Sequence, residues 1–407
     1  MAELEDYRAR ARAWIAEHRR FAPADYGAIC PPHLVEHAVD WQRRIHDAGY
    51  AGINWPEHLG GQGLTIEHTA AWQVECASAG VPSAFNMVGL VLAGGAILRF
   101  GTPEQQAAHL RPTLAAEHLW CQLFSEPGAG SDLGSLTTRA ERDGDHYVVN
   151  GQKVWCSGGR YSNWGILMAR TDSAGAATAH SDPGAGKHDG ISFFLFPMDL
   201  AGVDVRPLRQ MTGEAEFDEV FLTDVELPAE HLLGPLHGGW GVGMAVLTNE
   251  RGHIGTAVIG LERRLEQLVA IVDADGQVEE LGPIERQQLA GLVARGQAYK
   301  AMALRQGPAA STAASLMKLG ITELMFDAAM LRGGLGGASS SVDGAGASGM
   351  LAAPGGTIAG GTSQIQRNII GERLLGLPRE PKPSSSTQGS TAQGSTAQGS
   401  ATAFDRE

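Results

Sequence analysis

The chain has 407 residues and a net charge of −14 at pH 7, with 43% apolar and 19% charged residues. This composition predicts a globular protein of two or three domains rather than a disordered or membrane-spanning chain. Acidic residues outnumber basic ones and the chain contains no block of basic residues, so a nucleic-acid function has no electrostatic support. The apolar run from Met87 to Leu98 is too short for a bilayer, which needs about 20 residues.

The N-terminus and the cysteines indicate the compartment. Met1 to Arg12 has mixed charge and no apolar stretch, so we expect no signal peptide and a cytoplasmic location. The cysteines are far apart and form no Cys-x-x-Cys pair: Cys30, Cys76, Cys121 and Cys156. Reduced thiols are therefore a better prediction than a disulfide framework or a zinc site. The fourteen histidines form no His-Glu-x-x-His grouping, so we expect no bound metal.

The first 120 residues predict a helical domain. Segments such as Asp6 to Arg20 and Leu34 to Ala48 are rich in Ala, Glu, Arg and Gln and lack the alternation of strands. Thr102-Pro103-Glu104-Gln105 carries a helix start signal, with Thr as N-cap, Pro at the first helical position and Gln completing a capping box.

Residues 121–235 predict a small, mostly antiparallel β domain. The Asn150-Gly151 dipeptide lies between Tyr147-Val148-Val149 and Lys153-Val154-Trp155, which favours a hairpin with a two-residue turn. Further strands are expected at Ile191 to Met198, Val203 to Leu208 and Glu219 to Leu222.

Residues 236–380 predict a second helical domain. Apolar residues from Ile254 to Leu268 recur every three or four positions, which indicates a long helix that also carries Glu250 and Arg251. A final helix is expected from Ser363, with Ser363 and Gln366 as a capping box. Ser173 to Gly190 and Gly333 to Gly356 are expected to be loops, and the repetitive residues 381–407 a disordered tail.

The segment from Leu123 to Asp132 has the clearest ligand-binding character. Gly128 and Gly130 would let backbone N–H groups approach a ligand, and Ser125 and Ser131 add hydroxyl groups. A plain tight turn is an equal alternative for a Gly-rich segment taken alone, and no Rossmann Gly-x-Gly-x-x-Gly is present. Two further segments strengthen the ligand interpretation. They are Trp155 to Ser157, where we expect a buried Trp155, and Gly360 to Gln364 at a helix start that suits a phosphate.

The order of the domains and three motifs resemble the acyl-CoA dehydrogenase family of flavoproteins. The motifs are Ser125-Glu-Pro-Gly-Ala-Gly-Ser131-Asp132, Lys153-Val-Trp155-Cys-Ser157 and Gly361-Thr-Ser-Gln-Ile-Gln-Arg367-Asn-Ile-Ile. The resemblance covers roughly residues 1–380. It implies an α+β fold with an all-α N-terminal domain, a small antiparallel β domain and an all-α C-terminal four-helix bundle.

The resemblance also implies FAD as the cofactor. Phe124 and Ser125 would contact the flavin pyrimidine, while Ser157 would bond near N5 with Trp155 against the ring. Ser131 would touch the substrate pantetheine or the cofactor phosphates. The implied cofactor residues are Phe124, Ser125, Gly130, Ser131, Trp155, Cys156, Ser157, Thr362, Ser363 and Gln364.

The implied reaction removes the α proton of an acyl-CoA thioester while the β hydrogen leaves as hydride to flavin N5, giving the trans-2-enoyl-CoA. Many family members place the base as Glu directly before Gly-Thr-Ser, where this chain has Gly360. Others place Glu before Arg on the long helix, which Glu250-Arg251 matches. A solvated helix pair is the alternative for Glu250 and Arg251. The implied base is thus Glu250, and the implied substrate residues are Ser131, Arg251, Gly360 and Gly361, with the Gly360 N–H donating to the thioester oxygen.

Two regions depart from the family pattern. Val272 to Glu285 contains no Arg-x-x-Phe-Gly, and the aromatic-rich loop near the usual Gly-Gly-x-Gly is replaced by Leu331-Arg-Gly-Gly-Leu-Gly-Gly337 and a Ser/Gly stretch. Divergent actinobacterial-type members show such losses, and some form two-subunit complexes that act on steroid side-chain thioesters. The alternatives to a dehydrogenase of lipid or fatty acid metabolism are therefore a non-catalytic or half-site partner subunit and an oxidase- or monooxygenase-like relative.

The resemblance finally implies the partners. These are an acyl-CoA substrate, an electron-transferring flavoprotein, and further copies of the chain in a dimer or tetramer, with a heteromer as the alternative. Arg286, Arg295 and Lys300 are candidates to replace the missing arginine that reaches the neighbouring subunit's FAD.

Overall fold

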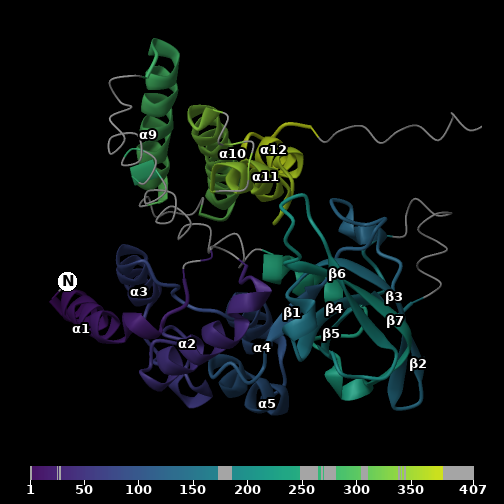
Figure 1. The fold of residues 1–407 in the computed structure, drawn as a ribbon. Coiled ribbons are helices and arrows are strands. Elements are labelled where there is room, and N and C mark those ends of the chain that lie inside the picture. The colour runs from purple at the N-terminus through teal and green to yellow at the C-terminus, as the bar shows by residue number, and fades with distance from the viewer. Residues whose placement is uncertain are drawn as a thin grey trace, which may run out of the picture.

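A computed structural model describes residues 2–24, 26, 29–172, 186–247, 281–303, 310–337 and 345–378, with single positions at 265, 266, 269, 340 and 342. Helices come first, a sheet follows, and helices return at the end, where they form a separate layer beside the other two parts (Figure 1). Within the described residues, no helix combines the length and the apolar character that a membrane crossing requires.

The N-terminal part is helical, as its composition predicts. Its α-helices are α1 (Ala2–His18), α2 (Val35–Asp47), α3 (Ile66–Ala79), α4 (Gly94–Phe100) and α5 (Pro103–Leu114), and a π-helix (Val88–Ala93) leads into α4. The expected capping box at α5 is confirmed, because Thr102 Oγ1 accepts from the Gln105 N–H and the Gln105 side chain accepts from the Thr102 N–H.

The middle part is one mostly antiparallel sheet. Its strands are β1 (Trp120–Leu123), β2 (Arg139–Asp143), β3 (His146–Ser157), β4 (Trp164–Arg170), β5 (Ile191–Pro197), β6 (Val203–Leu208) and β7 (Phe217–Pro228). They lie in the order β1-β4-β2-β3-β7-β6, with β5 paired to β4. The β1–β4 and β2–β4 pairs are parallel and the others antiparallel.

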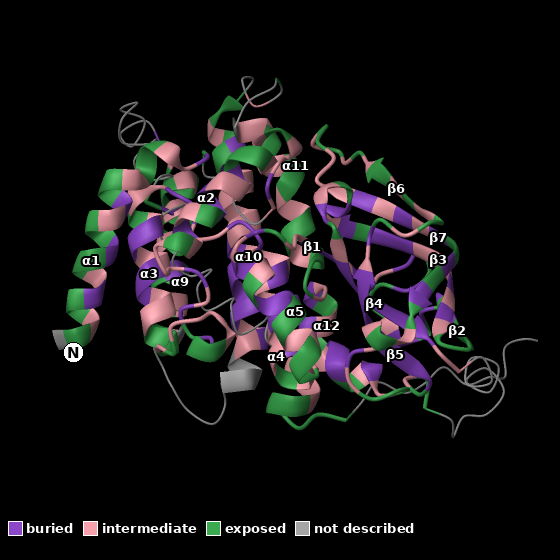
Figure 2. Ribbon diagram, turned by 90° about the horizontal axis from the view of Figure 1, so that it is seen from below, coloured by how far each residue is buried: buried purple, intermediate pink, exposed green. Residues whose placement is uncertain are grey.

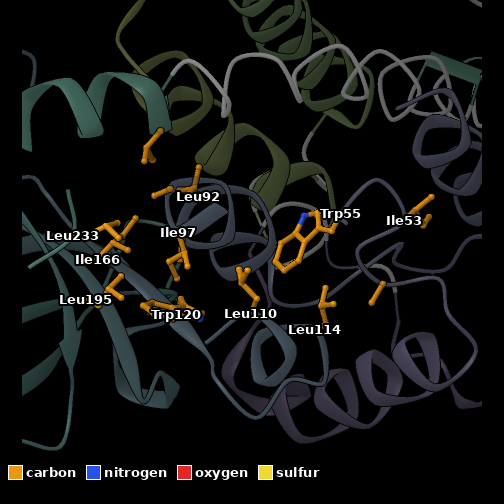
Figure 3. Close-up of a cluster of buried hydrophobic side chains, with 14 of the residues drawn as sticks. Ile53, Trp55, Leu92, Ile97, Leu110, Leu114, Trp120, Ile166, Leu195 and Leu233 are labelled. Carbon is orange, nitrogen blue, oxygen red and sulfur yellow. The ribbon is translucent and has the colours of Figure 1, made fainter. Parts of the chain in front are cut away.

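Both faces of the sheet are buried, each in a different core. Along β4, Ile166 and Met168 join the core of the N-terminal helices, while Leu167 and Ala169 join a second core on the other face. This is the period-two alternation of a strand. Figure 3 shows the shared core, where Trp55, Leu110 and Leu114 of the helical part lie in one cluster with Trp120 and Leu195 of the sheet. Buried positions accordingly run through the strands in Figure 2.

The C-terminal part contains α9 (Pro283–Ala303), α10 (Ala310–Leu335), α11 (Ala345–Ile358) and α12 (Ser363–Ile369), followed by a π-helical turn, Ile370–Leu374. Residues 239–247 are also helical and lead towards Glu250. The expected long helix through Ile254 and Leu268 lies almost wholly outside the described residues, as do residues 173–185 and the tail.

The predicted hairpin at Asn150-Gly151 is wrong. β3 runs unbroken through this dipeptide, and the turn lies earlier, at Gly144-Asp145 between β2 and β3. The Asn150 side chain instead exchanges two hydrogen bonds with Asp224, at 2.9 and 3.0 Å, where the β3–β7 register shifts. Gly151 is required by close packing, since a Cβ there would lie 2.4 Å from Thr138 Oγ1.

The predicted loop at Gly333 to Gly356 is also wrong in large part. α10 continues to Leu335, and α11 occupies residues 345–358 despite Pro354. Glycine serves here to bring two helices together, because a Cβ at Gly333 would collide with the Met350 sulfur. Helix contacts therefore outweigh the low helix propensity of this segment.

Candidate active site

The loop after β1 is joined to the middle of β3 by backbone and side-chain hydrogen bonds. The Val154 N–H donates to the Ser125 carbonyl at 2.9 Å, and Lys153 Nζ donates to the Phe124 carbonyl at 3.1 Å. Two of the three motifs singled out from the sequence are therefore brought together, although they are about 30 residues apart in the chain. Phe124 itself is buried and meets Phe193 edge to face.

Glu126 is the anchor of this loop rather than a ligand group. Its carboxylate is buried and accepts from Lys153 Nζ at 2.9 Å, from the Thr137 N–H and hydroxyl, and from the Thr138 N–H. Burial alone would raise the pKa of Glu126, but the Lys153 charge and these hydrogen bonds outweigh it and lower the pKa to about 2. A fully buried ion pair thus holds the loop in place.

Trp155 stands at the surface beside this loop, so the expectation of a buried side chain is wrong. The β3–β7 register shifts between Lys153 and Cys156, and within this bulge Trp155 has φ +61°. Its side chain is 55% exposed and touches Phe217 edge to face at 5.7 Å. A left-handed tryptophan costs on the order of 1–3 kcal/mol, and such strain is concentrated at functional sites.

The two residues that follow Trp155 differ in which of their atoms could contact a ligand. Cys156 lies in the second core with no exposed surface, and burial raises its pKa well above the usual thiol value. Only its backbone can therefore reach a ligand on the Trp155 side. Ser157 is half-buried at the end of β3.

The glycine turn has the open geometry that a planar ligand requires. A Cβ built on Gly128 or Gly130 would meet no described atom within 4 Å, and Gly130 and Ser131 are exposed. Asp132, next to Ser131, pairs with Lys187 and accepts from the Ser135 hydroxyl. The exposed indole of Trp155 and this unfilled turn fit a flavin ring, which needs an aromatic wall and close backbone approach.

Arg170 fastens the segments that flank the turn, and sequence reasoning missed it. Its guanidinium is buried and donates to the carbonyls of Gly134 and Leu136 on one segment and of Lys187 and Asp189 on the other. Burial lowers the pKa of Arg170. A pattern search could not find it, because a lone arginine at a strand end resembles a surface residue.

The third motif lies between α11 and α12. Thr362, rather than Ser363, is the N-cap of α12, since its hydroxyl accepts from the Ile365 N–H at 3.2 Å, so the predicted Ser363–Gln366 capping box is wrong. Ser363 and Gln366 are buried, and the Gln366 amide donates to the carbonyls of Gly360 and Gly361. Gln364 is exposed.

Gly360 and Gly361 both have left-handed backbones, with φ +65° and +98°. A residue with a Cβ rarely adopts such angles. This geometry agrees with the presence of glycine at 360, where many proteins of the family that the sequence resembles carry the glutamate base. Because neither glycine has a side chain, this turn can contact a ligand only through its backbone, including its N–H groups.

Glu250 and Arg251 lie outside the described residues. Of the arginines considered for a neighbouring subunit, Arg295 pairs with Asp327 of its own chain at 2.8 Å. No cluster of three His, Cys, Asp or Glu side chains suited to a metal is present in the described ranges. All four cysteines are free, which agrees with the prediction of reduced thiols, and all four are buried.

Comparison with known proteins gives one consistent result. Three family models match in chain order: acyl-CoA dehydrogenase N-terminal domain over residues 1–117, middle domain over 121–225 and C-terminal domain over 237–375. The chain has the three-part fold of the flavoprotein dehydrogenases. It belongs to the acyl-CoA dehydrogenase family, and the cofactor is FAD.

Several relatives resemble the chain over most of its length. It is 36% identical to acyl-CoA dehydrogenase IpdE1 of Mycobacterium tuberculosis, across 94% of this chain and 100% of that protein. It is also 36% identical to acyl-CoA dehydrogenase FadE34 of the same organism, across 83% of this chain and 46% of that one. Among solved structures, the Tcur3481-Tcur3483 steroid acyl-CoA dehydrogenase is 27% identical, with a TM-score of 0.77 over 93% of this chain and 99% of that chain. The ChsE4-ChsE5 complex of M. tuberculosis is 25% identical, with a TM-score of 0.73 over the same shares.

Proposed function

We propose that the protein catalyses FAD-dependent α,β-dehydrogenation of an acyl-CoA thioester to the trans-2-enoyl-CoA. The observation that carries this proposal is the exposed, left-handed Trp155, which follows the residue that bonds to Ser125 at the start of the loop with the open Gly128–Ser131 turn, in a chain of the acyl-CoA dehydrogenase family. Phe124, Ser125 and Ser157 would hold the flavin through backbone and hydroxyl groups, and Thr362 to Gln364 would hold the rest of the cofactor.

The chain's own residues divide the chemistry between a base and an oxyanion donor. Bound FAD would accept the β hydrogen as hydride. Glu250 would take the α proton, for which a carboxylate with a raised pKa in an apolar surrounding is suited. The Gly360 N–H would donate to the thioester carbonyl oxygen and stabilise the charge that develops there. Arg251 and Ser131 would position the substrate.

An anaerobic titration of the FAD-loaded protein with a panel of acyl-CoA thioesters tests this proposal. A productive substrate bleaches the flavin absorbance in the wild type. Glu250→Gln should retain FAD but lose about 10²–10⁴-fold in the rate of bleaching, the usual loss on removing a general base. Glu266→Gln, an exposed glutamate farther along the chain, is the matched control and should bleach normally. Wild-type rates in Glu250→Gln would place the base elsewhere, for example at Glu372 or Glu323.

A half-site subunit of a heteromeric complex is the second candidate. Two observations favour it: the absent Arg-x-x-Phe-Gly and the similarity to the ChsE4-ChsE5 complex and the Tcur3481-Tcur3483 steroid enzyme. A bulky steroid side-chain thioester would then be the substrate class.

We also propose a cytoplasmic location, supported by four free cysteines in the described structure, and an electron-transferring flavoprotein as electron acceptor.

A further inference from the structure

Lys318 is a buried cation on α10 for which the reaction described above has no role. The residue is 2% exposed and lies among the buried apolar residues Met317, Ile321 and Leu324 of the same helix. Its ammonium donates to the Gly361 carbonyl at 2.7 Å and, at the limit of a hydrogen bond, to the Thr357 carbonyl at 3.5 Å. Burying a lysine is costly, so these contacts must be favourable enough to offset the loss of hydration.

The turn that Lys318 contacts is held from a second side. Gln366 Nε2 donates to the Gly360 carbonyl at 3.2 Å and to the Gly361 carbonyl at 3.4 Å. The same amide lies only 2.7 Å from the position that a Cβ on Gly361 would occupy. The Ala359 N–H donates to the Gly355 carbonyl at 2.9 Å, which fixes the chain just before the turn.

These anchors matter because two consecutive glycines would otherwise be free to rearrange. Gly360 and Gly361 have no side chains to hold their positive φ angles, and glycine populates many backbone states. The Gly360 N–H has no acceptor within the part of the chain that the structure describes. A donor that is free while the two carbonyls that follow it in the chain are held is arranged for a ligand oxygen.

We propose that Lys318 is a positioning residue for the oxyanion donor. By holding the Gly361 carbonyl, it keeps the Gly360–Gly361 turn in the one conformation that presents the Gly360 N–H to the thioester oxygen. This inference rests on the proposed function. It predicts that removing the ammonium weakens ionisation of the bound thioester without removing any group that touches it.

The test uses a 3-thia-acyl-CoA, a thioester that cannot be dehydrogenated and has an acidified α carbon. Its α-proton loss in the FAD-loaded protein is followed by long-wavelength absorbance as a function of pH. Lys318→Met should raise the midpoint of this titration by about one to two pH units, the equivalent of the ~10²-fold loss that a slightly misplaced group causes. Gln366→Met should shift the midpoint in the same direction by less.

Ser315→Ala is the matched control. Ser315 lies one turn before Lys318, is fully buried, and has a hydroxyl without a partner in the described structure. Its loss should leave the midpoint unchanged even if the melting temperature changes. A wild-type midpoint in Lys318→Met with FAD retained would overturn the proposal and leave Lys318 a packing residue.

Amide hydrogen exchange at Ala359, Ile365 and Gln366, whose N–H groups are hydrogen-bonded on either side of the turn, separates this proposal from the proposed function when it is measured in the ligand-free protein. Lys318→Met should exchange at least about tenfold faster there than Ser315→Ala, because the turn loses its anchor. If the wild type fails to ionise the probe but this difference is present, the proposed reaction fails while the anchoring role survives. Equal exchange in the two variants would overturn the anchoring role itself.

Discussion

At the scale of single residues, two buried lysines organise the site, and neither could be predicted from the sequence. Lysine is almost never fully buried unless it is paired, so a pattern analysis assigns it to the surface. Lys153 belongs to a motif that the family resemblance supplied, but its contact with Glu126 appears only in the fold. The same resemblance identified Trp155, yet the bulge that exposes it could not be anticipated from a β-rich run.

Lys153→Met should reduce the free energy of unfolding by about 3–5 kcal/mol at neutral pH, because it leaves the Glu126 carboxylate buried without its cation. In the wild type the pKa of Glu126 is lowered from 4.5 to about 2. Its contribution to stability is therefore present above about pH 4.5 and is lost as the pH falls towards 2. In the variant, burial should raise that pKa above 4.5, so acid should stabilise the variant relative to neutral pH.

Chemical denaturation between pH 3 and pH 7 measures this difference. The difference in the free energy of unfolding between the wild type and Lys153→Met should become smaller as the pH falls from 7 to 3. Lys187→Met, which removes an exposed partner of Asp132, serves as the control and should cost much less. A constant gap across the pH range would show that Lys153 contributes packing rather than charge.

At the scale of elements, local signals succeeded where they act through local hydrogen bonds. The α5 capping box involves atoms only three residues apart, so the sequence contained all the necessary information. The Asn150-Gly151 error has the opposite cause, since Asn150 bonds to Asp224, 74 residues away. α11 likewise depends on its packing against α10, which no helix propensity reveals.

A cluster of histidines marks the junction between α5, β1 and the 3₁₀ turn after β7. His109 Nδ1 lies 3.3 Å from His118 Nδ1, and both rings contact Trp120 and Trp164. Burial, with His118 and His231 nearby, lowers the pKa of His109 to about 4. Burial also lowers the pKa of His118 and His231, whose acidic neighbours Glu117 and Glu230 oppose the shift.

The His109→Phe variant should be less sensitive to mild acid than the wild type. Between pH 6.5 and 4 the unfolded chain binds a proton at this histidine and the folded chain does not. Wild-type stability should therefore fall over this window, by on the order of 2–3 kcal/mol for His109 alone. Phenylalanine at this position should remove the contribution of His109 to the fall in stability with pH. Melting temperatures at pH 7 and pH 5 test it, with His33→Phe, an exposed position, as the control. If His109→Phe loses as much melting temperature between pH 7 and pH 5 as the wild type does, the prediction is contradicted.

At the scale of the whole molecule, the domain order could be predicted from the sequence, because runs of helix and strand patterning are long. How several chains assemble could not be predicted from this patterning. Several large apolar side chains of the C-terminal part are exposed in the single chain, including Ile284, Ile358, Leu375 and Leu377 at 55–68%. Leu375 and Leu377 lie close together in the chain, and contiguous exposed apolar side chains commonly indicate a surface that another chain covers.

We therefore expect an oligomer, and a homo-oligomer in preference to a heteromer. Light scattering should give a multiple of 42.8 kDa. Leu375→Asp combined with Leu377→Asp should lower the mass and the FAD content, whereas Ile66→Asp, an equally exposed site on α3, should not. A monomer with full FAD occupancy would refute the oligomer. A sharp rise in FAD content on co-expression with a homologue from the same genomic neighbourhood would overturn the homo-oligomer.

The two-sided sheet has a consequence for how the chain becomes folded. Ile166, Met168, Phe193 and Leu195 face the N-terminal helices, so a fragment of residues 120–247 alone would leave that face in water. The middle segment is thus a unit of sequence comparison but not of cooperative folding. During synthesis the helices that cover this face emerge from the ribosome first, and the strands then have a surface on which to assemble. Circular permutation that moved those helices to the end of the chain would remove this advantage while keeping every native contact.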